Sequence, residues 1–379
     1  MLRIEAWVAV VAAYVLLALA YGWPQDYRNE SPGFVLVAWA AFLVRVLQFH
    51  LGLALGTIAL IAAFGRGRRL FLAAAPLVVF LLGPPLWSYL NPPTGAGRLP
   101  AGIHTPVMRV MSANLLVVNQ DTQGIIDEIV AARPDVVLLQ EYTDHWHAAM
   151  KPALSGQYPF SSFVTQDDSF GVAVYSRTPF VGGGVDNRLP LGQSLVPQTR
   201  AVVRFAGRDV AVYNVHLLPP RRLDYTTESR LQFADLLKTL SEEKLPYVVA
   251  GDWNFTGDAP QHRDLARAGA RDAHDLAGRG RGATWPVNSF FRYLPGLRFD
   301  HVYLGPGMTA VRSEVGVGRG SDHRPVIADV TIDAPPAPAS APAPVPVSVP
   351  ARESAPTPAS ASAPASAPAA PQSSPHPPR

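Results

Sequence analysis

The chain has 379 residues, of which 48% are hydrophobic and 16% are charged, and its mean hydropathy is +0.11. These values argue against a chain made wholly of membrane helices and favour one that combines membrane segments with a globular domain. The absence of cysteine excludes disulfide bonds, cysteine-bound zinc and thiol catalysis. Residues 101–332 carry 23 Lys or Arg and 24 Asp or Glu, so this region lacks the basic charge typical of nucleic-acid binding.

Apolar segments fill residues 1–91, and membrane helices are predicted at 4–23, 46–64 and 70–90. A cleavable signal peptide is the alternative for the first of them. The lack of a small-residue cleavage site and the further apolar segments disfavour it. The stretch that precedes residue 46 is predicted to be a tilted or interfacial segment.

A short basic connection, GRGRR at 65–69, indicates the orientation of these helices. Because arginines in short loops stay in the cytoplasm, three spans place the amino terminus inside and everything after residue 91 outside. A four-span arrangement would place that region inside, but it needs two helices of about fourteen residues and moves the arginines outward. We therefore expect a multi-pass protein of the plasma (inner) membrane with its globular domain on the outer, periplasmic side.

A Pro- and Gly-rich linker is predicted at 92–103 and a globular α/β domain at 104–333. Apolar runs such as DVVLLQE and DVAVYNVHL predict strands in this domain, and the amphipathic run ESRLQFADLLKTLSEEKLP predicts a helix that ends before Pro246. Residues 334–379 are so rich in Pro, Ala and Ser that they cannot bury a core, and we expect a disordered tail there.

Acidic, amide and imidazole side chains stand at the ends of the predicted strands, where α/β architectures expose reactive groups. The set comprises Asn114, Glu141, His216, Asp252, Asn254, Asp300, Asp322 and His323. Taken singly, each residue has the alternative role of capping a turn or ending a strand in solvent. Together they form a ligand set of oxygens and imidazoles, without thiols, that suits Mg²⁺ or Mn²⁺ rather than zinc.

Six short motifs carry these residues, in the order SANL, LLQE, VYNVHL, GDWN, RFDHVYL and SDHRPV. Together they resemble the motif set of the endonuclease/exonuclease/phosphatase superfamily, which includes deoxyribonucleases, abasic-site endonucleases, neutral sphingomyelinases and inositol-polyphosphate phosphatases. The resemblance covers residues 107–332. It implies a two-sheet β-sandwich flanked by helices, in four layers, and metal-dependent hydrolysis of phosphoester bonds.

The resemblance also implies roles for the motif residues. The implied Mg²⁺ ligands are Glu141, as the principal one, with Asn114 and Asp322, and Mn²⁺ is the alternative ion. The implied catalytic residues are His216 at the phosphate or leaving oxygen, Asp252 and Asn254 at the attacking water, and His323 with Asp300 orienting its ring. Either Asp252 or His323 accepts the proton of the water, and the choice stays open.

One feature departs from the secreted deoxyribonucleases, which pair their first catalytic His with a Glu. No clear match to that Glu occurs here, although Asp167 or Asp168 could substitute. His301 alternates out of phase with Asp300 on the same predicted strand, so we expect it to be packed or exposed rather than catalytic.

Three further residues are candidates for substrate binding. Arg200 in QTRAVV and Arg230 in ESRLQF match positions where family members often keep an Arg, although Arg230 has an ordinary salt bridge as its alternative role. Trp285 lies in an aromatic segment, TWPVNSFFRYLPGLRFD at 284–300. This segment could stack on nucleic-acid bases, face lipid or pack on the domain, and the three alternatives stay open.

The sequence therefore predicts a membrane-tethered, Mg²⁺-dependent phosphodiesterase or phosphatase. Its substrate is a phospholipid, a small phosphoester or a nucleic acid, and no protein partner is indicated. A surface endonuclease or exonuclease on DNA or RNA is the alternative with the same chemistry. A non-catalytic binding protein that keeps the fold is the alternative of another class, and the completeness of the strand-end set argues against it. A transporter is disfavoured because the apolar segments lack repeats and carry few ionisable groups.

Overall fold

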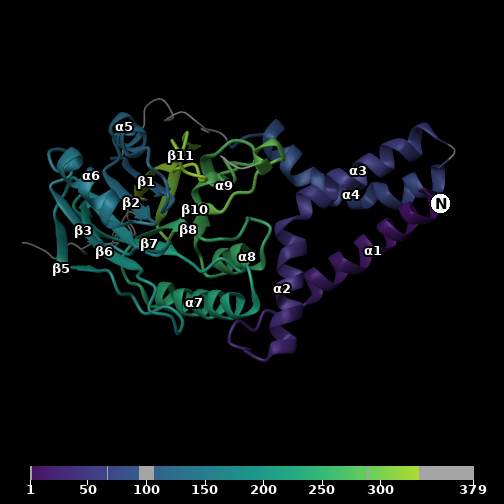
Figure 1. Ribbon diagram of the computed structural model, residues 1–379, viewed down its shortest axis with the longest axis horizontal. Coiled ribbons are helices and arrows are strands. Elements are labelled where there is room, and N and C mark those ends of the chain that lie inside the picture. The colour runs from purple at the N-terminus through teal and green to yellow at the C-terminus, as the bar shows by residue number, and fades with distance from the viewer. Residues whose placement is uncertain (1, 66, 94–105, 288–289, 333–379) are drawn as a thin grey trace, which may run out of the picture. The chain divides into compact units, whose positions relative to one another are not determined.

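The computed structural model describes residues 2–65, 67–93, 106–287 and 290–332 (Figure 1). Within them, the N-terminal region is helical and the remainder is a mixed α/β domain. The predicted tail at 334–379 and most of the predicted linker at 92–103 lie outside the described residues.

The N-terminal helices are α1 (Leu2–Gly22), α2 (Pro32–Val46), α3 (Gln48–Phe64) and α4 (Arg68–Leu90). By length and composition, α1 and α4 could each cross a membrane, and α2 with α3 adds a third candidate if this bent pair counts as one span. The bend between α2 and α3 is 61°. Three of these helices overlap the predicted spans, while α2 occupies the stretch that was expected to be tilted or interfacial.

The first sheet has six strands in the order β11-β12-β1-β2-β4-β3. Their bounds are β1 (Met108–Asn114), β2 (Val136–Gln140), β3 (Phe160–Val164), β4 (Val172–Ser176), β11 (Met308–Val315) and β12 (Val326–Ile332). Two helices, α5 (Thr122–Ala132) and α6 (Asp144–Leu154), cover its outer face, where Ile125 and Trp146 pack against Met111 and Leu139.

The second sheet has six strands in the order β5-β6-β7-β8-β10-β9. Their bounds are β5 (Phe180–Asp186), β6 (Thr199–Phe205), β7 (Arg208–His216), β8 (Tyr247–Asp252), β9 (Arg271–Asp272) and β10 (Asp300–Leu304). The remaining helices are α7 (Leu223–Glu242), α8 (Pro260–Arg267), the short α9 (Ala273–Ala277) and the 3₁₀ turn η1 (Phe290–Tyr293). Phe233 of α7 packs on Tyr213 of the outer face, in a cluster that also contains Phe42 and Val46 of α2.

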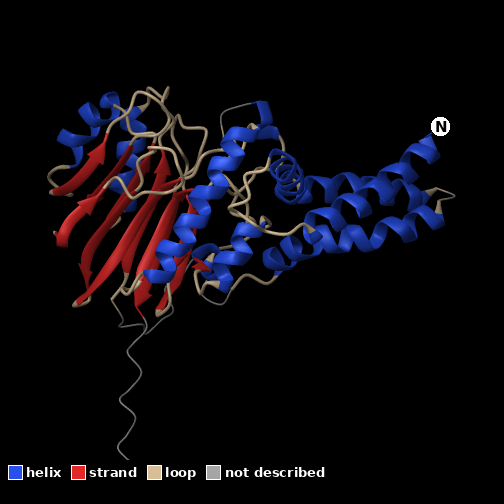
Figure 2. Ribbon diagram, turned by 90° about the horizontal axis from the view of Figure 1, so that it is seen from below, coloured by secondary structure: helices blue, strands red, loops and turns tan. Residues whose placement is uncertain are grey.

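The two sheets pack face to face through alternate strand residues, since a strand points successive side chains to opposite faces. Val110 and Leu138 of the first sheet join Val212 and Val248 of the second in one buried cluster. Figure 2 shows the strands of the sheets with helices on their outer sides. The predicted two-sheet sandwich flanked by helices is therefore confirmed.

Strand direction brings the predicted site residues to one edge. β1 and β2 are parallel, with Asn114 beside Gln140, and β7 and β8 are parallel, with His216 beside Asp252. β10 runs antiparallel to β8, and this register places its first residue, Asp300, opposite Asp252. Residues that are far apart in sequence thus meet where these strands end or begin.

Candidate active site

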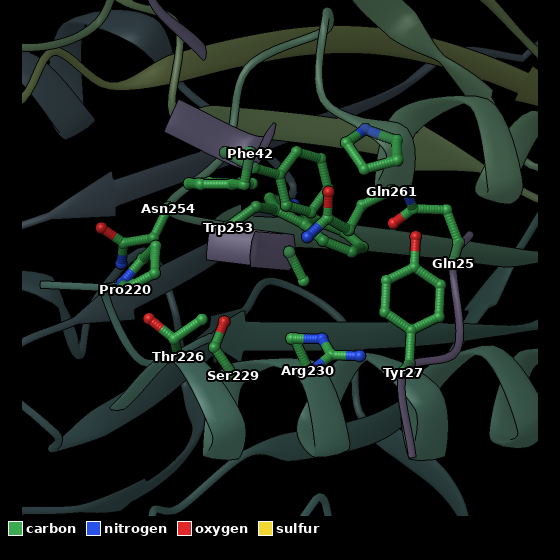
Figure 3. Close-up of a pocket in the computed structure, with 13 residues that line it drawn as sticks. Gln25, Tyr27, Phe42, Pro220, Thr226, Ser229, Arg230, Trp253, Asn254 and Gln261 are labelled. Carbon is green, nitrogen blue, oxygen red and sulfur yellow. The ribbon is translucent and has the colours of Figure 1, made fainter. Parts of the chain in front are cut away.

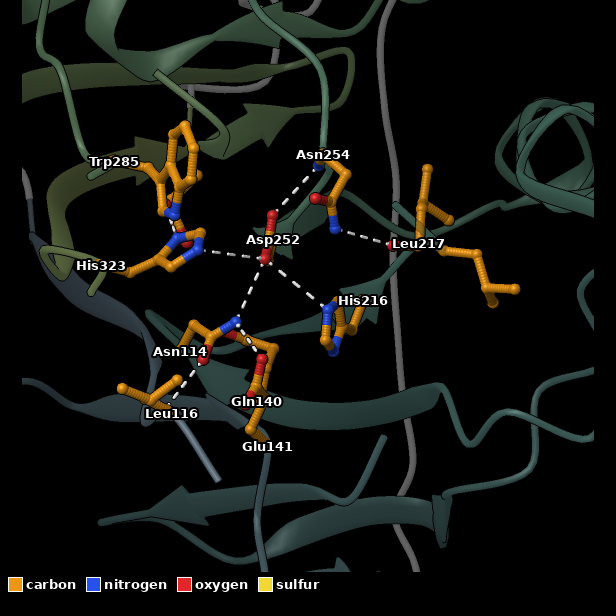
Figure 4. Close-up of polar contacts among 12 residues, drawn as sticks. Asn114, Leu116, Gln140, Glu141, His216, Leu217, Asp252, Asn254, Trp285 and His323 are labelled. Carbon is orange, nitrogen blue, oxygen red and sulfur yellow. Dashed lines mark hydrogen bonds and ion pairs between the residues drawn. The ribbon is translucent and has the colours of Figure 1, made fainter. Parts of the chain in front are cut away.

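Asp252 is the centre of the site (Figure 4). Its buried carboxylate accepts a hydrogen bond from Asn114 Nδ2 at 3.1 Å and lies 3.6 Å from His216 Nε2 and 3.7 Å from His323 Nε2. The other carboxylate oxygen accepts the backbone N–H of Asn254 at 3.0 Å. Asp252 therefore joins groups from both sheets, and burial raises its pKa even though both imidazoles act to lower it.

The imidazole of His323 is held by Asp300. Asp300 Oδ2 lies 2.8 Å from His323 Nδ1, and both residues are buried. Burial acts to lower the pKa of His323, but the carboxylates of Asp300 and Asp252 outweigh it and raise that pKa to about 10. His323 is thus an imidazolium at neutral pH. His216 differs, because burial outweighs Asp252 and lowers its pKa.

Glu141 follows β2 and turns toward the same edge. Its backbone is in the left-handed region, with φ +56°, a costly conformation for a residue with a side chain and one that is common at functional sites. Its carboxylate accepts the Val117 N–H at 2.7 Å and Asn114 Nδ2 at 3.1 Å, and burial raises its pKa. Asn114 therefore bridges the carboxylates of Glu141 and Asp252.

The donor set fits a divalent cation. Asp322 Oδ1 and Asp300 Oδ1 are buried without a hydrogen-bond partner. Burial raises the pKa of both Glu141 and Asp252, because the neighbouring hydrogen-bond donors and imidazoles do not fully offset the desolvation of these carboxylates. A bound cation would offset it. Oxygen ligands of this kind suit a hard cation such as Mg²⁺ or Mn²⁺. Asp252, Asp300 and His323 also offer ligand atoms that all lie within 4.8 Å of one another.

A cleft gives access to these groups. Its polar lining includes Glu141, His216, Asp252, Asn254, Asp322 and His323. Trp285, predicted to bind substrate, also lines the cleft and donates its indole N–H to Asp322 Oδ2 at 3.2 Å. Six of the eight strand-end residues thus line the cleft, and the other two contact residues that do: Asn114 contacts Glu141, and Asp300 contacts His323.

Gln198 positions His216, and no sequence signal indicated it. Its side chain accepts the backbone N–H of His216 at 2.7 Å and donates to the His216 carbonyl at 2.8 Å. Phe170 packs beside the imidazole at 5.6 Å between ring centroids. Neither Asp167 nor Asp168 substitutes as an acidic partner, because His216 Nδ1 has no hydrogen-bond partner in the described structure and the Asp168 carboxylate accepts the Phe170 N–H.

Both predicted substrate-binding arginines are engaged elsewhere. Arg200 forms an ion pair with Glu243 at 2.8 Å and does not line the cleft. Arg230 donates to the backbone carbonyls of Asn29 and Asp26, in the connection between α1 and α2. Figure 3 shows Arg230 in a separate cavity beside Tyr27. The prediction that these two arginines bind substrate is not supported, because their guanidinium groups stabilise the fold.

Replacement of Arg200 by Met is expected to destabilise the protein by about 2 kcal/mol, the usual value of a hydrogen bond to a charged group. Burial acts to raise the pKa of Glu243, but hydrogen bonds from Tyr213, the Leu245 N–H and Arg200 hold it below its ordinary value of 4.5. A depressed pKa stabilises the fold above that ordinary value, and this stabilisation is lost as the pH falls through the folded-state pKa. Thermal unfolding should therefore show a lower midpoint for Arg200→Met at neutral pH and a narrower difference below pH 4.5. A large fall in turnover without a fall in the midpoint would contradict this structural role.

A second group of ligand-type side chains, His262, Asp272 and His301, lies outside the residues that line the cleft, and its carboxylate is already paired. His301 Nδ1 lies 2.6 Å from Asp272, and Arg298 occupies the other Asp272 oxygen at 2.8 Å. His301 is buried, so of the two predicted alternatives, packed or exposed, the packed one is confirmed. His274 is buried nearby.

A family model places this site among known proteins. The model for the endonuclease/exonuclease/phosphatase family matches residues 111–323, which is more than half of the chain. The chain belongs to the endonuclease/exonuclease/phosphatase family. Members of this family are metal-dependent phosphoesterases, so the chain is a hydrolase that acts on phosphoester bonds. The match spans the residues from β1 to His323 that form the cleft.

Solved structures of this family resemble the chain at low identity. An endonuclease/exonuclease/phosphatase protein from Beutenbergia cavernae is 24% identical over 60% of this chain and 72% of its own, with a TM-score of 0.47. TDP2 from D. rerio, solved with a single-strand DNA product, is 19% identical over 59% and 99%, with a TM-score of 0.49. A 3'-5' exonuclease from Neisseria meningitidis is 20% identical over 60% and 100%, with a TM-score of 0.49. A search of curated proteins finds no match.

Proposed function

We propose that the chain is a membrane-tethered, Mg²⁺-dependent phosphodiesterase or phosphatase. The observation that carries the proposal is that the imidazoles of His216 and His323 both lie within 3.7 Å of the Asp252 carboxylate, in a cleft that Glu141 and Asp322 also line. Phosphoryl transfer needs positioning and positive charge around the phosphate more than it needs a covalent partner. The cleft supplies side chains that can position the phosphate and a charged imidazole, His323, that can stabilise it.

Glu141 and Asp322 would hold Mg²⁺, with Asn114 beside them; Mn²⁺ is the alternative ion. The bound ion would polarise the phosphoester and neutralise part of its charge. Asp252 would accept the proton of the attacking water, since His323 is already protonated, and Asn254 would help to orient that water. His323, held by Asp300, would stabilise negative charge on the phosphate, and neutral His216 would contact the phosphate or the leaving oxygen.

A surface nuclease on DNA or RNA is the second candidate within this chemistry, because TDP2 from D. rerio was solved with single-strand DNA. The near-neutral charge of residues 101–332 favours phospholipids and small phosphoesters over nucleic acids. A binding protein without catalysis is the candidate of another class. This alternative does not explain why Asp300 and Asp322 each keep one buried carboxylate oxygen without a hydrogen-bond partner, whereas a bound metal ion would explain it.

We also propose that the protein resides in the plasma (inner) membrane with the catalytic domain on the outer, periplasmic side. Two helices that could span a membrane, the bent pair α2 and α3 counted as a third span, and the arginines at 65–69 support this placement. A cytoplasm-specific reporter fused after residue 334 should be inactive. Activity of that reporter would reverse the orientation.

The test of the enzymatic proposal is hydrolysis by the full chain in detergent micelles, with bis-p-nitrophenyl phosphate, p-nitrophenyl phosphate, plasmid DNA and sphingomyelin as substrates. We expect Mg²⁺-dependent turnover that EDTA abolishes. Replacement of Glu141 by Gln keeps the shape and removes a ligand charge, so the Mg²⁺ concentration for half-maximal activity should rise about 10–100-fold.

The matched control for this change is Glu242→Gln, at the end of α7 and outside the cleft. It should leave the Mg²⁺ dependence unchanged. Turnover that resists EDTA, or an equal effect of the two variants, would contradict the proposed metal site. No turnover on any substrate would favour the binding-only alternative.

A further inference from the structure

One wall of the catalytic cleft comes from the N-terminal helices. Phe42, Leu43 and Val46 of α2 line the same cleft as Glu141 and His323. α2 is fixed in this place: Trp39 donates its indole N–H to the Pro220 carbonyl at 2.8 Å, and Phe42 and Val46 belong to the buried cluster on the outer face of the second sheet. Figure 3 shows Phe42 beside Trp253 and Asn254 of the loop after β8. A helix outside the catalytic domain therefore forms an apolar side of the cleft.

A second face of α2, which meets the cleft at Leu43, is also apolar, and it is exposed. Leu36 and Leu43 of α2 and Leu47, which follows α2, are 50%, 37% and 45% exposed, and their sequence spacing is helical. A helix with apolar side chains on both faces is typical of burial against protein on one side and lipid on the other. Only Leu47 separates α2 from α3, and α3 continues the apolar surface with exposed Leu53, Leu60 and Ile61. The exposed face of α2 thus joins the surface of a candidate membrane span.

The far side of the cleft approaches the same helices. Trp285 and Phe299 line the cleft, and the loop between them is held against α3 by a hydrogen bond of 2.7 Å between His50 Nε2 and the Pro295 carbonyl. Tyr293 and Leu294 of this loop are exposed. The side chains of Phe290 and Phe291 lie outside the described part of the structure. This arrangement favours the lipid-facing alternative for the aromatic segment at 284–300.

The charges of the cleft do not match a nucleic-acid strand. Among the described residues that line it, Arg221 is the only Lys or Arg, whereas Glu141, Asp168, Asp252 and Asp322 contribute carboxylates. Proteins that bind single strands use a cationic groove that follows several phosphates. One arginine and an apolar helical wall suit a single phosphoester that carries an apolar group.

We infer that the substrate is a long-chain phosphoester lipid whose phosphate enters the cleft while its chain lies along Leu43 of α2 at the membrane surface. This inference rests on the proposed phosphoesterase function and adds the class of substrate. Leu43 belongs both to the cleft and to the exposed face of α2, so a chain that leaves the cleft there passes directly onto the lipid-facing surface. Only the headgroup of the lipid then has to leave the bilayer, while its chain stays at the membrane surface.

The experiment compares hexadecyl p-nitrophenyl phosphate with methyl p-nitrophenyl phosphate, using the full chain in mixed micelles with Mg²⁺. The two diesters share the scissile bond and release the same p-nitrophenol, so they differ only in the alkyl chain. We expect kcat/KM for the hexadecyl ester to exceed that for the methyl ester by about 100-fold. Leu43→Asn should lower this ratio about tenfold, mainly through KM, because it removes one apolar contact with the chain. Leu43→Met should keep the ratio.

Leu36→Asn is the matched control, because it makes the same change on the same exposed face of α2 but outside the cleft. It should leave the ratio unchanged. Equal kcat/KM values for the two esters, or equal loss of the ratio in Leu43→Asn and Leu36→Asn, would overturn the lipid inference while leaving the phosphoesterase proposal intact. A single-stranded oligonucleotide hydrolysed with a higher kcat/KM than the hexadecyl ester would also overturn it. No hydrolysis of either ester would overturn the lipid inference, and it would refute the proposed function itself only if bis-p-nitrophenyl phosphate, p-nitrophenyl phosphate, plasmid DNA and sphingomyelin were not hydrolysed either.

Discussion

Replacement of Asp252 by Asn is expected to lower kcat about 10³-fold, within the range that a positioned general base contributes. The carboxylate is the point at which Asn114, His216, Asn254 and His323 meet, and Asn has the same shape without the charge. The amide could accept from one of these donors, but it could not take a proton from water or balance the imidazolium of His323. Turnover of bis-p-nitrophenyl phosphate by the full chain in micelles measures the effect.

Asp186→Asn, at the exposed end of β5, is the control for the same chemical change. It should leave kcat within about twofold of the unmodified protein, as is usual for surface substitutions away from a site. Thermal unfolding of both variants should separate catalytic from structural loss. If Asp252→Asn retained most of the activity, His323 or another group would have to be the base.

The ends of the strands could be predicted from the sequence, because each apolar run and the polar residue that follows it are neighbours in the chain. Parallel pairing of β7 with β8 then brings His216 beside Asp252, as the joint appearance of such residues after apolar runs had indicated. The distances among the side chains of the site could not be predicted, because they depend on how the two sheets pack against each other. The same holds for the Gln198 contacts with the His216 backbone, which no motif marks.

Arg200 shows why a local motif match can mislead. It pairs in register with Tyr213, and Tyr213 belongs to the cluster on the outer face of the second sheet. Val212 belongs instead to the cluster between the sheets. Because side chains alternate along a strand, His216 shares the inner face with Val212, and Arg200 points away from the catalytic edge. The sequence motif could not show this, since the face depends on pairing with β7.

The position of α2 beside the cleft could not be predicted from the sequence either. The apolar stretch at 34–64 could be recognised as too long and too interrupted for one straight span, which left the part before residue 46 as a tilted or interfacial segment. The residues that α2 contacts, Pro220, Trp253 and the core around Phe233, lie 181 or more positions away in sequence, so no local pattern encodes these contacts. The apolar wall that carries the lipid inference is therefore a property of tertiary structure.

Replacement of His323 by Asn is expected to lower kcat by about 10²–10³-fold, because it removes the charged ring that faces Asp252. Asn can place its amide N–H near the position of Nδ1 and so keep a donor for Asp300, which limits damage to the fold. Asp300→Asn should have a smaller effect, since the imidazole stays and only its carboxylate partner is lost. If Asp300 acts through His323, the double variant should be no slower than His323→Asn alone, because the two residues work as one unit. Additive losses in the double variant would show that Asp300 contributes to turnover independently, for example as a metal ligand with Asp252 and His323.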